Sequence, residues 1–260
     1  MKSNKNVPVL TIEDYISSSS QQSRSFTNWN HLKPGEKINL SKYKRPIVLA
    51  AHPDDLEAFA GGLVFQLKDL LSVIYSGGDK GIWNPQYRKM DKDEYIQLRL
   101  KEASEAGKLL GVSEIIYMGY LDRGIKCTEV SVRNALLILE RYEPDLVVSF
   151  EFYRGRNIDP HPDHIAVGEI TRRAVMMYKG KGSLDYIVMS TLFPNVFVDV
   201  SDVRRFKVVA LGEHDSQDDF NSIIFPFLEK FITKIWGAYN GVDYAEGYRF
   251  VDTQTMKYRD

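Results

Sequence analysis

Short apolar runs alternate with helical patterns along most of this 260-residue chain, and this alternation constrains the fold more than any other feature. The run "PIVLAA" has no polar member, as is typical of a strand buried on both faces of a sheet. Strands are expected at 46–51, 72–76, 114–120, 145–150, 185–191 and 195–200, and helices at 56–70, 93–111, 130–142 and 164–178. The pattern predicts an α/β fold of the Rossmann-like, doubly wound kind, with a mostly parallel sheet and helices on both faces.

Composition and charge narrow the class of protein. Basic and acidic residues number 34 and 35, and the formal net charge of −1 argues against a nucleic-acid or membrane-surface protein. Cys127 is the single cysteine and no apolar run has the length of a membrane span, so we expect a cytoplasmic protein. Residues 1–44 are polar and loop-like and are interpreted as an N-terminal extension, which leaves 45–260 as one domain. The sequence does not determine the oligomeric state, and a homo-oligomer is one of the states that it allows.

Two polar clusters follow predicted strands. "HPDD" begins at His52, directly after the first strand, and "NIDPHPDH" ends at His164, shortly after the strand at 145–150. Ligands of such sheets bind outside the carboxyl ends of the strands. We therefore expect the two clusters to meet at one edge of the sheet, although His52 and His164 are 112 positions apart.

The residue types in these clusters suit a catalytic metal. His52, Asp55 and His164 would supply two imidazoles and a carboxylate, and a fourth position would stay open for water, as in catalytic zinc sites. Asp54 would remain free to accept a proton from that water. Two histidines and one carboxylate also suit non-haem iron, but iron chemistry gives no evident use to the extra carboxylate. Helix capping is the simpler reading of each cluster alone. It is disfavoured because three of the five histidines fall in the two clusters.

These motifs resemble the LmbE-like, or PIG-L, family of zinc-dependent N-deacetylases. The likeness is carried by "AHPDDLEAFAGG" and the later "HPDH", and it extends over about residues 45–250. Weaker matches follow in family order: "SGGDKG", "RLKEASEAGKLLGV" with Arg99 and Glu102, "GYLDRGI", "KVVALGEHDSQ" and "AEGYRF".

The resemblance implies a fold, a reaction and a set of roles. His52, Asp55 and His164 would hold one Zn²⁺ per chain, and Asp54 would be the general base. His161 would stabilise the oxyanion of the tetrahedral intermediate, helped in its charged state by Asp163. The expected substrate is an N-acetylated amino sugar, such as N-acetylglucosamine, or its glycoconjugate.

Other residues near the clusters allow two readings each. Asp122, after a strand, would bind sugar hydroxyls or merely cap a loop. Arg88 belongs to a rim loop with Trp83 and Tyr87, where it would contact the sugar or simply be exposed. His214 is expected to be structural. The rival functions are an amidase with a non-sugar N-acyl substrate and a catalytically silent carbohydrate-binding relative.

Overall fold

The structure is a computed structural model and describes residues 35–67, 69–180, 182–217 and 225–253. Most of the N-terminal extension, residues 1–34, lies outside the described residues, so its boundary at residue 44 stays a prediction. Residues 36–37 already pair with a strand of the domain.

A single eight-stranded sheet runs through the described part of the chain, in the order β1-β7-β8-β6-β5-β2-β3-β4. β8 pairs antiparallel with β6 and β7, and the other pairings are parallel. The strands are β1 (Glu36–Lys37), β2 (Pro46–Ala50), β3 (Leu70–Ser76), β4 (Val112–Tyr120), β5 (Leu146–Phe150), β6 (Asp185–Met189), β7 (Val196–Asp199) and β8 (Ala245–Val251).

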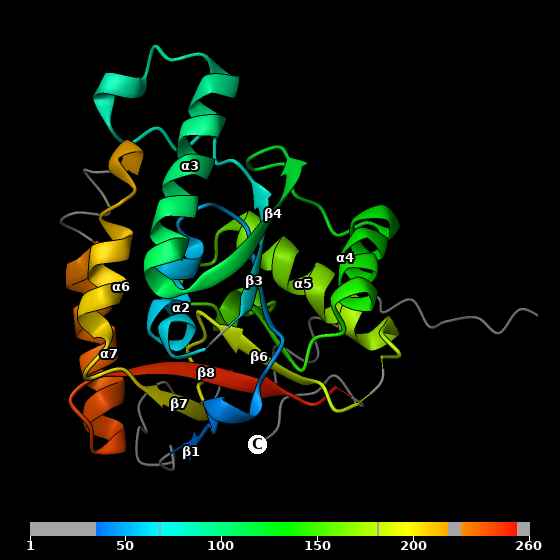
Figure 1. Cartoon of the computed structure of the whole chain (residues 1–260), viewed down its shortest axis with the longest axis vertical. Coiled ribbons are helices and arrows are strands. Elements are labelled where there is room, and N and C mark those ends of the chain that lie inside the picture. The colour runs from blue at the N-terminus through cyan, green and yellow to red at the C-terminus, as the bar shows by residue number, and fades with distance from the viewer. Residues whose placement is uncertain (1–34, 68, 181, 218–224, 254–260) are drawn as a thin grey trace, which may run out of the picture. The chain divides into compact units, whose positions relative to one another are not determined.

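Helices cover both faces of the sheet (Figure 1). On one side α2, α3 and α6 pack on one another, and on the other side α4 packs on α5. The helices are α2 (Asp55–Gln66), α3 (Lys92–Leu110), α4 (Glu129–Tyr142), α5 (Pro162–Met177), α6 (Arg204–Leu211) and α7 (Phe225–Asn240). The short 3₁₀ helices are η2 (Leu40–Lys42), η3 (Pro85–Tyr87), η4 (Arg154–Arg156) and η5 (Asp215–Gln217). The predicted α/β fold is confirmed.

The core lies at the centre of the sheet. Every residue of β2, β3 and β5 is buried, which agrees with their mostly apolar sequences. After β1, which lies at one edge of the sheet, the chain forms β2 and then adds β3 and β4 on one side of β2 and β5 and β6 on the other. The boundary between β2 and β5 is therefore the point where the strand order reverses, and this is where such sheets bind ligands.

Three elements differ from the expected pattern. The helix expected at 56–70 ends at Gln66, and Leu70 already begins β3. The helix of the second cluster begins at Pro162 rather than at His164, because Pro162 occupies its first turn and His161 caps it. Near the C-terminal end of the chain, the run "FLEKFITKIW" has the amphipathic pattern typical of a core helix and lies in α7. This helix buries Thr233 and Trp236 but leaves Phe227 and Phe231 71% and 61% exposed. An amphipathic pattern predicts which residues share a face of a helix. It does not predict that every apolar residue of that helix is buried.

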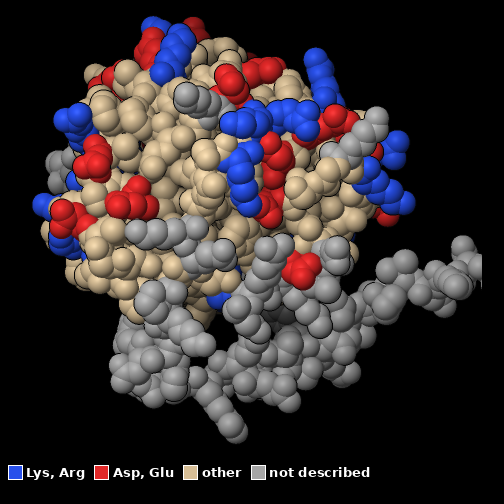
Figure 2. Space-filling model, turned by 60° about the horizontal axis from the view of Figure 1, so that its bottom comes forward, with Lys and Arg blue, Asp and Glu red and all other residues tan. Residues whose placement is uncertain are grey.

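Two surface properties bear on the expected partners. On the face turned to the viewer in Figure 2, basic and acidic side chains lie beside one another, so neither sign dominates that face. Within the described residues, no helix combines the length and the apolar character that crossing a membrane requires.

Candidate active site

The two clusters meet where β2 and β5 end. These strands are parallel neighbours, so their carboxyl ends lie at the same edge of the sheet. His52 to Asp55 connect β2 to α2, and the segment from Asp159 to His164 leads from the loop after β5 into α5. The expected convergence of the clusters is thus a direct result of the strand order.

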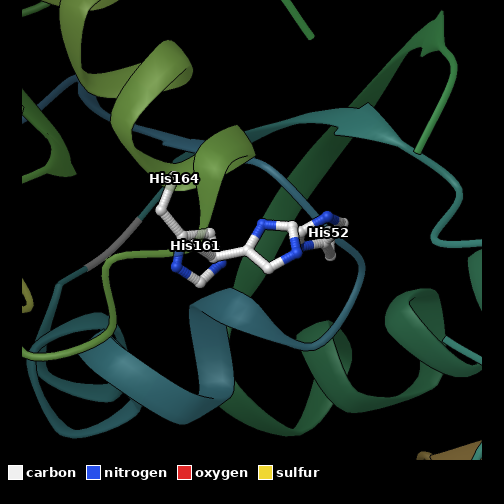
Figure 3. Close-up of side chains that lie close together, drawn as sticks. All are labelled: His52, His161 and His164. Atoms are coloured by element: carbon white, nitrogen blue, oxygen red, sulfur yellow. The ribbon is translucent and has the colours of Figure 1, made fainter. Parts of the chain in front are cut away.

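Three imidazoles gather at this edge (Figure 3). The ring centroids of His52, His161 and His164 are 5.0, 5.2 and 5.4 Å apart. Each ring offers a nitrogen within 4.8 Å of the others, which is close enough for a shared cation.

Asp55 lies between two of these rings. Its Oδ1 is 3.1 Å from His164 Nε2, and its Oδ2 is 3.6 Å from His52 Nδ1. The backbone N–H groups of Ala51 and His52 donate to Oδ2 at 2.9 and 2.7 Å, which fixes the carboxylate. The three predicted metal ligands therefore face one another across a short gap.

The nitrogens that point away from this gap have partners of their own. His52 Nε2 lies 3.3 Å from Asp163 Oδ2 and 3.6 Å from Asp122 Oδ1. His164 Nδ1 lies 3.3 Å from the carbonyl oxygen of Asp159. Metal-binding histidines usually donate their second N–H to a carboxylate or a carbonyl, which fixes the tautomer and the ring. The donor set and its surroundings therefore fit a divalent metal.

Apolar packing holds one of these rings in place. The imidazole of His164 stacks on Phe150 with the ring centroids 4.0 Å apart, and Phe59 meets it edge-on at 5.6 Å. Phe150 ends β5 and Phe59 lies in α2, so the core itself orients the imidazole of His164.

Asp54 faces away from the helix that it precedes. It occupies the N-cap position of α2, yet its side chain makes no capping hydrogen bond. Arg99 of α3 instead donates from Nη2 to Asp54 Oδ1 at 2.9 Å. The capping interpretation of "HPDD" therefore does not describe Asp54, whose carboxylate is held by Arg99 next to the predicted metal ligand Asp55.

His161 caps α5 with its imidazole. Its Nδ1 accepts a hydrogen bond from the backbone N–H of Asp163 at 3.2 Å. In the neutral ring the proton then resides on Nε2, which can donate to a substrate. Burial, together with the neighbouring His52 and His164, lowers the pKa of His161 and favours this neutral form.

Burial and neighbouring charges shift the pKa values of His52, Asp55 and Asp54. Burial alone would lower the pKa of His52, but the carboxylates of Asp55, Asp122 and Asp163 raise it well above its usual value. Burial opposes ionisation of Asp55, but the charges of His164 and His52 hold its pKa well below its usual value. Burial also opposes ionisation of Asp54, yet Arg99 and then His214 lower its pKa. Both carboxylates are therefore held ionised.

The remaining predicted residues fall into two groups. The carboxylates of Asp163 and Asp122 are buried beside His52, and Asp163 Oδ2 also accepts from the backbone N–H of Arg123 at 2.7 Å. Asp122 Oδ2 accepts from the backbone N–H of Lys80 at 2.9 Å. Arg88, by contrast, is exposed just after η3. The substrate contacts predicted for Asp122 and Arg88 stay predictions.

One residue had no role in the sequence-based interpretation. Arg99 was noted only as part of a matching segment, although it contacts the predicted base. The available signal was an arginine on the apolar side of a helix pattern, flanked by Ala103 and Ala106, which are buried with it. His214 is buried, with its Nε2 3.4 Å from Glu57 Oε2, and its structural role stays a prediction.

Comparison with known proteins agrees with this geometry. The PIG-L family, described as GlcNAc-PI de-N-acetylase, matches residues 47–175, a range that includes both clusters. The chain belongs to the PIG-L family. It is a deacetylase of this family, that is, a hydrolase that acts on amides.

Relatives of this PIG-L protein match it over most of its length. It is 26% identical over 235 residues to a diacetylchitobiose deacetylase of Thermococcus kodakarensis, covering 83% of this chain and 86% of the relative. It is 28% identical over 187 residues to a probable N-acetyl-alpha-D-glucosaminyl L-malate deacetylase 2 of Bacillus cereus, covering 66% and 83%. The solved N,N'-diacetylchitobiose deacetylase from Pyrococcus horikoshii shares the fold, with a TM-score of 0.75, 23% identity and 95% coverage of both chains.

Proposed function

We propose that this PIG-L protein removes the acetyl group from an N-acetylated amino sugar or its glycoconjugate, with Zn²⁺ held by His52, Asp55 and His164. The observation that carries the proposal is the convergence of these three side chains on one gap, with His164 Nε2 3.1 Å from Asp55 Oδ1. Both curated relatives described above are named for N-acetylated sugar substrates. When bound, the metal would polarise the acetyl carbonyl and acidify a water molecule.

The protein's own groups would move the proton and hold the charge. Asp54, ionised and directed by Arg99, would accept the proton of the water that attacks the carbonyl carbon. His161 would donate from Nε2 to the oxyanion of the tetrahedral intermediate. Asp54 would then return the proton to the leaving amine, which releases acetate and the free amino sugar.

The neighbouring residues would support these groups. Asp163 would orient His52 through Nε2 and contribute a negative charge near His161, whose pKa it raises slightly against the stronger lowering effects. Asp122 would share the contact with His52. Contact of Asp122 or Arg88 with sugar hydroxyls belongs to this proposal as well.

Acetate release from a defined panel of substrates tests the proposal. The panel contains N-acetylglucosamine, N,N'-diacetylchitobiose and N-acetylated amino acids, each assayed with the zinc-loaded protein and after chelation. We expect acetate from the amino sugars, loss of this activity with chelator and its return with Zn²⁺. Equal turnover of the amino acids would contradict the sugar assignment. No acetate from any member would favour a silent binding protein, and turnover that requires iron and oxygen would contradict hydrolysis.

A further inference from the structure

Two matching segments contain buried polar groups that take no direct part in the chemistry described above. One is the face of α3 that carries Arg99 and Glu102, and the other is the segment from His214 to Gln217. Arg99, Glu102, His214, Ser216 and Gln217 are buried, whereas Asp215 is exposed. Arg99 and His214 both lower the pKa of Asp54.

Arg99 is an interior side chain with two fixed contacts. It is 3% exposed, and it donates from Nη2 to Asp54 Oδ1 at 2.9 Å and from Nη1 to the carbonyl oxygen of Gly78 at 3.0 Å. The close approach requires glycine at position 78, because a Cβ there would lie 1.7 Å from Nη1 and because φ is +66°. The loop after β3 is thus shaped around the guanidinium group.

Glu102 extends this arrangement by one helical turn. Its carboxylate accepts from the backbone N–H of Ser216 at 2.9 Å and from Ser216 Oγ at 2.5 Å. This contact ties η5 and the preceding His214 to α3. His214 Nε2 in turn lies 3.4 Å from Oε2 of Glu57, which belongs to the first turn of α2. Asp54 is therefore backed by buried charged groups from three elements.

We propose that Arg99 is a positioning residue that acts through Asp54, holding its carboxylate where it can accept a proton from water. This inference rests on the proposed function. Asp54 occupies an N-cap position, where an unrestrained carboxylate would turn to the N–H groups at the start of α2. A charge-assisted hydrogen bond is strong enough to compete with that capping interaction. Arg99 thereby keeps Asp54 out of the cap and separate in function from its neighbour Asp55.

A double-mutant cycle in kcat tests this role. Arg99→Gln removes the charge, and Asp54→Asn removes the base. We expect Arg99→Gln alone to lower kcat by up to about 100-fold, since a misplaced catalytic group costs about that much. In the Asp54→Asn background, where no base remains to be positioned, the same substitution should change kcat less than about twofold. KM and the zinc content should stay as in the wild type.

The controls separate positioning from general damage. Arg204 is also an arginine with a carboxylate partner, Glu229 Oε2 at 2.6 Å, and Arg204→Gln should lower Tm without a change in kcat. If Arg99→Gln does not fold, Arg99→Lys takes its place in the same cycle, because it keeps the charge but not the geometry of both contacts.

The outcomes distinguish this inference from the proposed function. Independent, multiplicative effects of the two substitutions would overturn the positioning role, and so would a rise in KM, which would indicate a sugar contact, or loss of zinc. A wild-type protein that releases no acetate from the panel would overturn the proposed function and this inference together.

Discussion

Asp54 and Asp55 are adjacent, yet their carboxylates face different partners. Asp54 is held by Arg99, whereas Asp55 lies between His52 and His164. Asp54→Asn keeps the shape of the side chain but cannot accept a proton, so zinc should stay bound while kcat falls roughly 10²–10⁴-fold. Asp55→Asn replaces a charged ligand by a weak neutral one, so zinc affinity should fall first and excess zinc should restore part of the activity. Metal analysis and acetate release on both variants measure the contrast.

His161→Ala is the matched comparison for this pair of variants. Loss of an oxyanion donor costs about 3–4 kcal/mol in the transition state, with the metal retained. An emptied site in Asp54→Asn together with a filled site in Asp55→Asn would reverse the two roles. Loss of zinc in His161→Ala would make this imidazole a ligand, in line with its closeness to the other two rings.

At the scale of elements, the contact between α5 and β5 places two of the three imidazoles. Gly168 lies one turn beyond His164 in α5, and a Cβ there would lie 2.6 Å from the carbonyl oxygen of Phe150. Gly168→Ala should therefore push α5 away from the sheet and destabilise the protein by about 1–3 kcal/mol, despite the better helix propensity of alanine. Zinc affinity should fall as well, because His161 and His164 begin this helix.

Denaturant unfolding and zinc titration of the variant check this prediction. Gly155→Ala is the control, since no atom lies within 4 Å of its added Cβ, and both measurements should match the wild type. An unchanged zinc affinity in a destabilised Gly168→Ala protein would mean that the histidines hold their places without the close contact of α5.

A cluster of buried charged residues links the antiparallel strand β8 to the helices α6, α7 and α2. Lys207 of α6 is 2% exposed, and its Nζ lies 2.7 Å from Glu246 Oε1 of β8 and 3.6 Å from Glu229 Oε1 of α7. Glu246 also accepts from the backbone N–H groups of Gly62 and Leu63 in α2. Lys207→Met would leave the two carboxylates without this partner, so the free energy of unfolding should fall by about 3–5 kcal/mol.

The exposed ion pair between Lys234 and Asp243 provides the control for this change. Lys234 and Asp243 lie 3.3 Å apart with side chains 55% and 78% exposed, so Lys234→Met should cost at most about 1 kcal/mol. Urea unfolding of both variants measures the loss in the free energy of unfolding. Equal losses would show that burial does not determine how much the Lys207 ion pairs stabilise the fold.

At the scale of the whole molecule, metal binding should stabilise the fold. The predicted ligands come from two segments 112 positions apart, so the unfolded chain does not present them together. Zinc at 100 times its Kd should raise the free energy of unfolding by about 2.7 kcal/mol and Tm by roughly 5–10 °C. Thermal melts with zinc and with chelator measure the shift. If zinc raises the Tm of His52→Ala by the same amount, His52 is not a metal ligand.

The sequence by itself determined which ends of which strands carry the reactive side chains. His52 to Asp55 follow a wholly apolar run, and the second cluster follows a second, mostly apolar strand, so local patterning and the rule for parallel sheets were sufficient to bring them together. It also predicted the α3 helix and its end at Gly111, which has φ +83°. These are properties of short segments, and short segments are what hydrophobic periodicity describes.

Only the tertiary structure decided which side chains touch. The helix predicted at 93–111 includes Arg99, but the contact of Arg99 with Asp54, 45 positions away, depends on how α3 packs against α2 and on the shape of the loop at Gly78. In the same way, the carboxylate of Asp163 faces His52, 111 positions away. The insertion of β8 between β6 and β7 has the same origin. A pattern within one element sets which face is buried, whereas the partner on that face is set by the rotation and depth at which two elements pack.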